Sequence, residues 1–91
     1  MNFEWDDDKA ALNLAKHGVS FAEAATVFSD ANALNFPDLE HSEFEERMHT
    51  IGYSASSRIL LVVNLDRGEQ LRIVSARRAT LSERQRYERS N

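Results

Sequence analysis

The sequence predicts one α+β domain, with two N-terminal helices on one face of a four-stranded, largely antiparallel sheet and a short helix at the C-terminus. Two observations lead to this fold class. Apolar residues repeat at helical spacing up to about Ser29, whereas from about Ala33 they alternate or run continuously, as in strands. The chain has 91 residues, 42% of them hydrophobic, with one Pro and three Gly, which is typical of a single compact domain over residues 1–91.

Two helices separated by a glycine are expected after a short β-prone segment, residues 3–5. The run of Asp at 6–8 supplies an N-cap and acidic first-turn side chains for a helix that continues to His17, and Gly18 is suited to end it. Residues 20–23, Ser-Phe-Ala-Glu, form a capping box for the second helix. Its apolar residues recur at helical spacing: Phe21, Ala24, Ala25 and Phe28.

Strands are expected in the next part of the chain. The first, residues 34–36, ends at Pro37 and suits an edge of the sheet, and the acidic stretch 38–46 indicates a solvated loop with room for some helix. Residues 47–54 alternate in polarity. Residues 58–65 are nearly continuously apolar, which predicts a central strand covered on both faces.

The fourth strand and the last helix carry most of the positive charge. After a hairpin turn, strict alternation over 70–77 places Leu71, Ile73, Ser75 and Arg77 on one face and Arg72, Val74, Ala76 and Arg78 on the other. Thr80–Glu83 is a second capping box. From Arg67 onward there are seven Arg and three Glu, whereas the preceding residues carry four Lys or Arg and twelve Asp or Glu. A chain of net charge −4 therefore has a local arginine-rich surface suited to a polyanion.

Composition excludes several classes of protein. The chain has no Cys and so no disulfide, thiolate metal ligand or cysteine nucleophile. No apolar run approaches the ~20 residues that cross a membrane, and the N-terminus is acidic where a signal peptide would be positive. Three His without regular spacing do not predict a metal site. We expect a soluble cytoplasmic protein with no membrane partner, metal or cofactor.

A series of short motifs runs the length of the chain. They are Phe3-Glu4-Trp5-Asp6, Lys9, Asn13, Lys16-His17-Gly18-Val19-Ser20-Phe21, Glu46-Arg47, Thr50-Ile51-Gly52, Arg72-Ile73-Val74-Ser75-Ala76-Arg77-Arg78-Ala79, Glu83-Arg84 and Arg86-Tyr87. In this order and spacing they resemble the BrnT toxins of bacterial type II toxin–antitoxin systems. The resemblance implies a RelE-like fold and a metal-independent ribonuclease that inhibits translation. It also implies a BrnA-type antitoxin with a ribbon-helix-helix DNA-binding part, so that the toxin meets operator DNA only through the antitoxin complex.

Arginines of the fourth strand and the last helix are the first candidates for an RNA site. Cleavage of RNA without a metal needs cations that hold the scissile phosphate and stabilise the charge of the transition state. We expect Arg77 to act in catalysis and Arg72, Arg78 and Arg84 to bind RNA. The alternative is that one or more of the strand arginines pair with the acidic loop residues 43–46.

Glu83 and Tyr87 lie four residues apart on the last helix and share a face. As general base and general acid they would suit attack by a ribose 2′-OH, which leaves a cyclic phosphate. Each also has a structural explanation. Glu83 is the third residue of a capping box, and Tyr87 either anchors the helix in the core or stacks on an unpaired base.

Lys16 and His17 end the first helix, where their charges favour the helix dipole. Beyond that structural role, Lys16 is a candidate to bind RNA and His17 a candidate acid or base near neutral pH. His41 falls in the acidic loop and is not expected to act. His49 alternates onto the face of Ile51, as either a half-buried residue or a site residue.

Two functions remain open from the sequence. The first is RNA cleavage at the arginine-rich surface. The second is a non-catalytic module, in which the same surface binds an acidic antitoxin segment within an operon-repressing complex. A structural domain whose arginines are only solvated is a third alternative.

Overall fold

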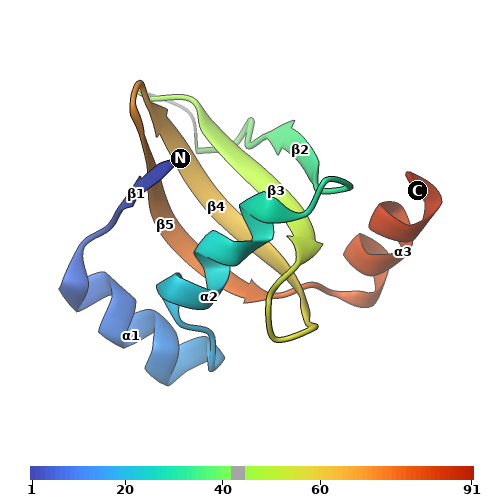
Figure 1. The fold of residues 1–91 in the computed structure, drawn as a ribbon, viewed down its shortest axis with the longest axis horizontal. Coiled ribbons are helices and arrows are strands. Elements are labelled where there is room, and N and C mark those ends of the chain that lie inside the picture. The colour runs from blue at the N-terminus through green and yellow to red at the C-terminus, as the bar shows by residue number, and fades with distance from the viewer. Residues whose placement is uncertain (42–44) are drawn as a thin grey trace.

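The computed structural model, which describes residues 1–41 and 45–91, has a five-stranded mixed sheet with α1 and α2 on one face and α3 beside it (Figure 1). The strands follow the order β1-β5-β4-β3-β2, and every neighbouring pair except β1 and β5 is antiparallel. The elements are β1 Asn2–Glu4, α1 Asp7–His17, α2 Phe21–Thr26, the 3₁₀ helix η1 Val27–Ser29, β2 Leu34–Pro37, β3 Arg47–Tyr53, β4 Ile59–Arg67, β5 Gln70–Arg78 and α3 Leu81–Arg89.

The predicted α+β class is confirmed, but the predicted four-stranded sheet is wrong in one detail. The first residues add a fifth strand, β1, which pairs in parallel with the start of β5. Three residues are too few to display the alternation of a strand, and the partner of Glu4 is Arg72, 68 residues later. None of the described helices is long and apolar enough to cross a membrane. Part of the predicted loop 38–46, namely residues 42–44, lies outside the described residues.

The predicted caps of the helices are confirmed. Asp6 Oδ1 accepts a hydrogen bond of 3.0 Å from the Lys9 amide, and Gly18 ends α1 in the left-handed conformation with φ 68°. Ser20 Oγ likewise accepts from the Glu23 amide at 3.0 Å. The return bond from the Glu23 side chain that would complete this capping box is replaced by contacts with another part of the chain.

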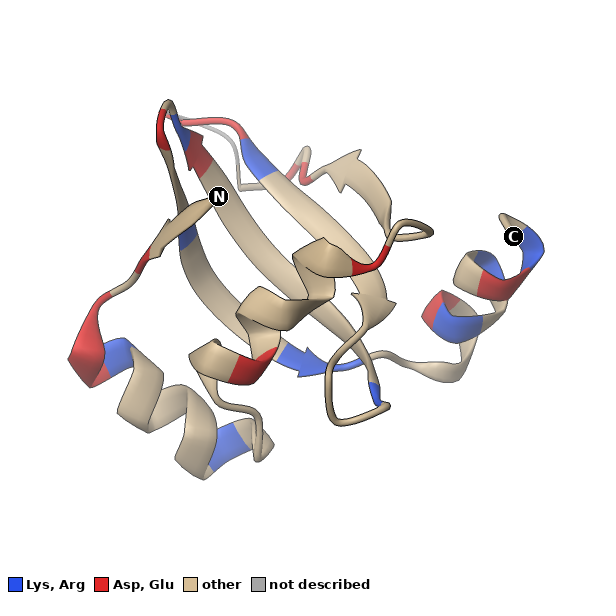
Figure 2. Cartoon of the chain, viewed as in Figure 1, with Lys and Arg blue, Asp and Glu red and all other residues tan. Residues whose placement is uncertain are grey.

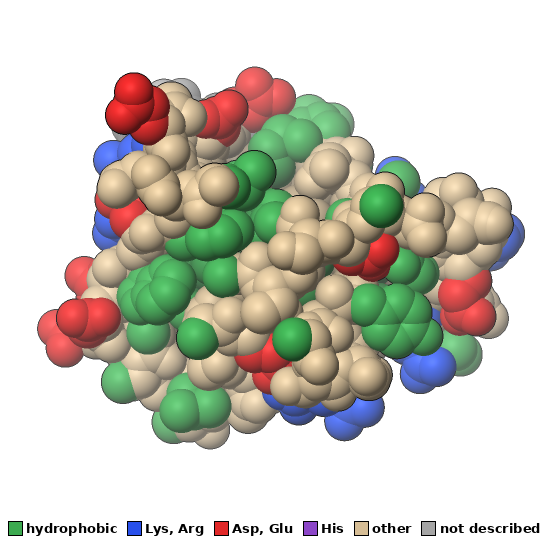
Figure 3. Space-filling view, viewed as in Figure 1, with side chains coloured by type: hydrophobic (Ala, Val, Ile, Leu, Met, Phe, Trp, Pro, Cys, Tyr) green, Lys and Arg blue, Asp and Glu red, His purple; other side chains and the backbone are tan. Residues whose placement is uncertain are grey.

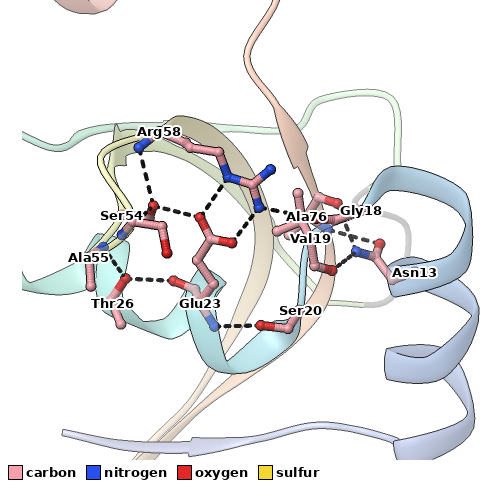
Figure 4. Close-up of polar contacts among 11 residues, drawn as sticks. Asn13, Gly18, Val19, Ser20, Glu23, Thr26, Ser54, Ala55, Arg58 and Ala76 are labelled. Carbon is pink, nitrogen blue, oxygen red and sulfur yellow. Dashed lines mark hydrogen bonds and ion pairs between the residues drawn. The ribbon is translucent and has the colours of Figure 1, made fainter.

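Glu23 uses its carboxylate to fasten α2 to the turn between β3 and β4 (Figure 4). Its oxygens accept hydrogen bonds from the Arg58 guanidinium and, at 2.6 Å, from the Ser54 hydroxyl. Arg58 also donates to the Gly18 carbonyl at 3.0 Å. The hydrogen bonds from Arg58 lower the pKa of Glu23, so the carboxylate is charged and the pair holds the corner between the helices and the sheet.

The main core lies between the two helices and the central strands. Its buried members are Val19, Phe21, Ala24, Val27, Leu60, Val62, Ile73 and Ala76. A smaller cluster on the opposite face contains Ile51, Leu61 and Tyr87. β4 is therefore covered on both faces, as its apolar run predicts, although α3 covers its second face only in part. On the helix face, hydrophobic side chains reach the surface between the elements, and acidic side chains lie at the upper and left margins (Figure 3).

Asn13 connects α1 to β5 at Ala76 (Figure 4). Its side-chain amide donates to the carbonyls of Ala76 at 2.8 Å and Val19 at 2.9 Å, and its oxygen accepts from the Ala76 amide at 3.1 Å. β1 pairs with β5 only as far as Arg72, so the side chain of Asn13 takes the place of a strand neighbour at Ala76. The backbone immediately before Arg77 is thereby fixed.

An extra residue in β5 reverses the predicted faces of the strand. Ser75 lies opposite Val63 and Ile73 opposite Asn64, so Val74 has no partner on β4, as in a β-bulge. Residues directly opposite one another share a face. Arg77, opposite Leu61, and Arg72, opposite Leu65, therefore both lie on the face away from α1 and α2. The prediction that strict alternation separates Arg77 from Arg72 was wrong, because a bulge cannot be read from alternating polarity.

Candidate active site

A hollow of about 580 Å³ lies on the sheet face opposite α1 and α2. Leu61 and Val63 of β4 give it an apolar floor, and charged groups come from the neighbouring strands and the loop after β2. Such a mixture of apolar surface and a few polar groups is typical of a ligand site. Its lining residues are Phe36, Pro37, Asp38, Leu39, Glu40, His41, Arg47, His49, Leu61, Val63, Ser75 and Arg77.

Arg77 reaches this hollow from β5 while it is paired with Glu83 of α3. Its guanidinium donates two parallel hydrogen bonds to the carboxylate, of 2.7 and 2.9 Å. Glu83 also completes the predicted capping box, because its side chain accepts from the Thr80 amide at 2.9 Å. The hydrogen bonds between the two side chains raise the pKa of Arg77 and lower that of Glu83, so both are charged. The alternative partners of Arg77 in the loop 43–46 are not needed to explain its position.

Tyr87 anchors α3 rather than lining the hollow. It is 5% exposed, and its hydroxyl donates a 2.6 Å hydrogen bond to Asp30 Oδ2. Burial and the charge of Asp30 raise the pKa of Tyr87 to about 12. On the same helix, the guanidinium of Arg86 lies 4.1 Å from the centre of the Phe36 ring. These contacts compensate for the few apolar residues in α3.

Asp38 gathers two imidazoles at the wall of the hollow. Its Oδ2 accepts from His49 Nε2 at 3.0 Å and from His41 Nδ1 at 3.1 Å, and the Asp38 residue is buried. Burial works against the charged carboxylate, but the hydrogen bonds from His49, His41 and the Glu40 amide outweigh it and lower the pKa of Asp38. The arrangement places a charged carboxylate behind His49, which faces the same hollow as Arg77.

The remaining sequence candidates lie away from the hollow. Arg72 pairs with Glu4 of β1 at 3.0 Å. Lys16 and His17 lie on α1, on the other face of the sheet. Arg78 and Arg84 line a separate, smaller cavity at the end of β5. The structure thus brings together Arg77 and Glu83, with Tyr87 nearby, and separates the other predicted site residues from them.

The charges are divided between the two ends of the chain (Figure 2). Acidic residues cluster at the start of α1, whereas basic residues cluster at the end of β5 and alternate with acidic ones along α3. In the loop before β3, Glu45 pairs with Arg67 at 2.8 Å rather than with Arg72, Arg77 or Arg78, and residues 42–44 of that loop lie outside the described residues. A polyanion is therefore attracted mainly to the end of the sheet that carries α3.

A comparison with models of protein families decides the family of the chain. Residues 5–83 match the model described as the ribonuclease toxin, BrnT, of a type II toxin–antitoxin system. The chain belongs to the BrnT family. The resemblance found in the sequence is confirmed, and the BrnT family is one of ribonuclease toxins whose type II systems include an antitoxin partner.

A solved BrnT structure has a similar fold. The Brucella abortus ribonuclease toxin BrnT, determined at 1.1 Å resolution, matches with a TM-score of 0.69 and 29% sequence identity. The match covers 88% of this chain and 97% of that toxin. A sequence search of curated proteins finds no significant match.

In this BrnT chain, sequence reasoning missed the contact of Asp38 with His41 and left the place of His49 undecided. The spacing of Asp38 and His41 places them within one turn of chain, but His49 joins them only because β3 pairs with β2. Phe36 lies directly opposite His49 in that pairing, which brings the loop after β2 over the imidazole. The sequence gives little indication of this cluster, because Asp38 is one acid within an acidic stretch that has the composition of a solvated loop.

Proposed function

We propose that this BrnT toxin cleaves RNA in the hollow by attack of a ribose 2′-OH on the neighbouring phosphate, with side chains rather than a metal ion supplying the catalysis. A P–O2′ bond forms and the P–O5′ bond breaks, so the 2′-OH loses a proton and the leaving 5′ oxygen gains one. The products are a 2′,3′-cyclic phosphate and a 5′-hydroxyl. The observation that carries the proposal is the pairing of His49 with buried Asp38 in the same hollow as Arg77.

Arg77 is the proposed phosphate ligand. Its planar fork is held by Glu83 on a strand whose backbone Asn13 fixes, so little reorganisation is needed when charge develops on the phosphate oxygens. The side chain is 37% exposed, which leaves guanidinium surface for a substrate. The pairing with Glu83 orients this cation without burying it.

His49 is the proposed general base. When its Nε2–H donates to the Asp38 carboxylate, Nδ1 is left as the proton acceptor, and the negative charge of Asp38 stabilises the imidazolium that forms. His41 is the proposed proton donor to the leaving oxygen, because it is the second imidazole that lines the hollow. Three groups in one hollow then cover the requirements of the reaction.

The structure gives less support to proton transfer by Glu83, Tyr87 or His17. A carboxylate whose pKa is lowered by Arg77 is a weaker base, and a phenol whose pKa is raised to about 12 is a weaker acid. His17 lies on the opposite face of the sheet from Arg77. In this proposal Glu83 and Tyr87 position Arg77 and α3.

The test is cleavage of a defined 5′-labelled RNA by purified toxin in EDTA, with assay of the cyclic phosphate end. We compare the wild type with His49→Ala, Arg77→Ala and Glu83→Gln. Glu83→Gln breaks the same ion pair as Arg77→Ala but keeps the guanidinium, so it is the matched control for structural loss. Arg89→Ala removes an exposed arginine elsewhere on α3 and should behave as wild type.

Cleavage that persists in EDTA, leaves cyclic ends, and falls at least about 100-fold in His49→Ala and Arg77→Ala would support the proposal. Cleavage activity retained in His49→Ala would overturn the proposal. If the wild type leaves free RNA intact, the assay is repeated with translating ribosomes. A second negative would favour the alternative function, a non-catalytic module that binds the antitoxin.

We propose further that the antitoxin is a BrnA-like ribbon-helix-helix protein that covers the hollow and contacts operator DNA on behalf of the complex. The net charge of −4 and the acidic margin of the toxin disfavour direct binding of duplex DNA. An operator fragment should therefore shift in gel electrophoresis with the complex and not with toxin alone. A cellular RNA substrate places the activity in the cytoplasm.

A further inference from the structure

A second cavity, of about 160 Å³, lies at the end of β5 beside the start of α3. Three arginines from different parts of the chain line it: Arg58 after the β3–β4 turn, Arg78 at the end of β5 and Arg84 in α3. In Figure 3, which shows the face that carries α1 and α2, basic side chains gather along the lower edge of the molecule. The cavity volume is several times the ~30 Å³ that one water takes up in the liquid, which leaves room for a phosphate group.

Among the described residues, two of the three arginines have no counter-charge. Arg58 is held by Glu23 and the Gly18 carbonyl. Within the described part of the chain, by contrast, the side chains of Arg78 and Arg84 form no hydrogen bond or ion pair, and both are exposed. Arg58, Arg67, Arg72 and Arg77 each pair with a carboxylate. The cavity is thus a place where positive charge converges without a partner from residues 1–41 or 45–91.

An aromatic ring completes the cavity. Tyr53 is 49% exposed although its ring packs edge-on with Tyr87, at 5.8 Å between ring centres and 76° between planes. That contact restricts the orientation of the ring, and the Tyr53 hydroxyl has no hydrogen-bond partner among the described residues. An oriented aromatic side chain beside guanidinium groups is the combination that binds an unpaired base and its phosphate.

We infer that Tyr53, Arg78 and Arg84 form a subsite for a nucleotide that flanks the cleaved one in single-stranded RNA. Arg77 and Arg78 are adjacent at the end of β5 and project to opposite faces of the sheet, Arg77 into the hollow and Arg78 into the second cavity. One RNA strand that passes round this end of β5, beside the start of α3, would reach both. The inference rests on the proposed RNA cleavage and adds where the substrate is held beyond the scissile bond. An acidic peptide would use the two arginines but would leave the aromatic ring unexplained.

The test measures binding separately from chemistry. The probes are a fluorescent 2′-O-methyl dinucleotide and an octanucleotide, which lack the attacking hydroxyl, titrated at several KCl concentrations. The variants are Arg78→Ala/Arg84→Ala, Tyr53→Leu and the conservative Tyr53→Phe, with Arg89→Ala as the control for loss of an exposed arginine. Because Arg78 and Arg84 are exposed, their removal should leave the melting temperature unchanged.

The double arginine variant should bind the octanucleotide roughly tenfold more weakly, and its plot of log affinity against log salt should flatten by about 0.7 for each phosphate that the variant no longer neutralises. Tyr53→Leu should weaken the octanucleotide by roughly tenfold and Tyr53→Phe should not. The dinucleotide, which we expect to occupy the hollow alone, should bind all variants alike. Octanucleotide affinities and salt slopes equal to wild type would overturn the subsite, and an accompanying loss of antitoxin binding would assign the cavity to the protein partner. A toxin that binds through this cavity but cleaves no RNA would overturn the proposed chemistry and support the subsite.

Discussion

The Tyr87 hydroxyl and the Asp30 carboxylate lie 2.6 Å apart and join α3 to the turn before β2, across 57 residues of sequence. The same carboxylate oxygen accepts from the Tyr53 amide at 2.9 Å, and Oδ1 accepts from the Asn32 amide at 2.9 Å. One acid therefore organises the edge of β3, its own turn and the last helix. The position of α3, which brings Glu83 to Arg77, depends on it.

Tyr87→Phe should lower the free energy of unfolding by about 1.5–3 kcal/mol, because a hydrogen bond to a charged, partly buried group is removed. Urea unfolding measures this change. Tyr53→Phe is the matched control, since its hydroxyl has no partner among the described residues. RNA cleavage by folded Tyr87→Phe should fall less than it does in Arg77→Ala, because only the position of α3 is affected. A loss as large as that of Arg77→Ala would give Tyr87 a role as proton donor.

Glu23→Gln should destabilise the protein by about 1–3 kcal/mol at pH 7 and much less in acid. Arg58 lowers the pKa of Glu23 below its ordinary value of 4.5, so the stabilisation is complete above about pH 4.5 and is lost as the pH falls through the lower pKa of the folded state. Unfolding curves for both proteins from pH 7 to pH 3 should therefore converge. The control is Glu69→Gln, which replaces an exposed carboxylate and should unfold like the wild type at pH 7. A difference between Glu23→Gln and the wild type that persists at low pH would contradict the role of the Arg58–Glu23 ion pair.

Asn13→Ala should cost at least about 2 kcal/mol of unfolding free energy, because it leaves the buried amide and carbonyl of Ala76 without partners. Hydrogen exchange at the Ala76 amide should accelerate more than exchange elsewhere in β5. Gln85→Ala, which removes an exposed amide side chain from α3, should leave both measurements unchanged. Uniform acceleration along β5 would indicate that the loss of Asn13 acts through global unfolding alone.

Gly52→Ala should destabilise the protein by about 1–3 kcal/mol through overpacking. A Cβ at this position would lie 3.0 Å from Val27 Cγ1 and 3.1 Å from Asp30 Oδ2. Because Asp30 is also the acceptor of Tyr87, Gly52→Ala and Tyr87→Phe should combine non-additively in a double-mutant cycle. Additive costs would show that the methyl group is accommodated without moving Asp30.

Much of the fold follows from local chemistry in the sequence. The acidic N-cap at Asp6, the glycine at Gly18 and the capping box from Thr80 to Glu83 act within a few residues, and all appear as predicted. The continuous apolar run of β4 likewise identifies the strand that is covered on both faces. These features depend on neighbours in the chain, which the sequence displays directly.

The features that were missed depend on partners far along the chain. Residues 3–5 were predicted to be β-prone, but their place in the sheet as β1 depends on pairing with β5, and the bulge at Val74 depends on the register of β5 against β4. The candidate site has the same character, because β2 and β3 must pair before Asp38 and His49 can meet.

The pairing of β1 with β5 has a consequence for the order of events during synthesis. The first strand of the chain cannot pair until residues 70–72 have been made, and Arg77 and α3 emerge later still. A partly synthesised chain therefore has neither a closed sheet edge nor a positioned Arg77–Glu83 pair. In the proposed chemistry, a ribosome that is making this toxin meets no activity until β5 and α3 have been synthesised.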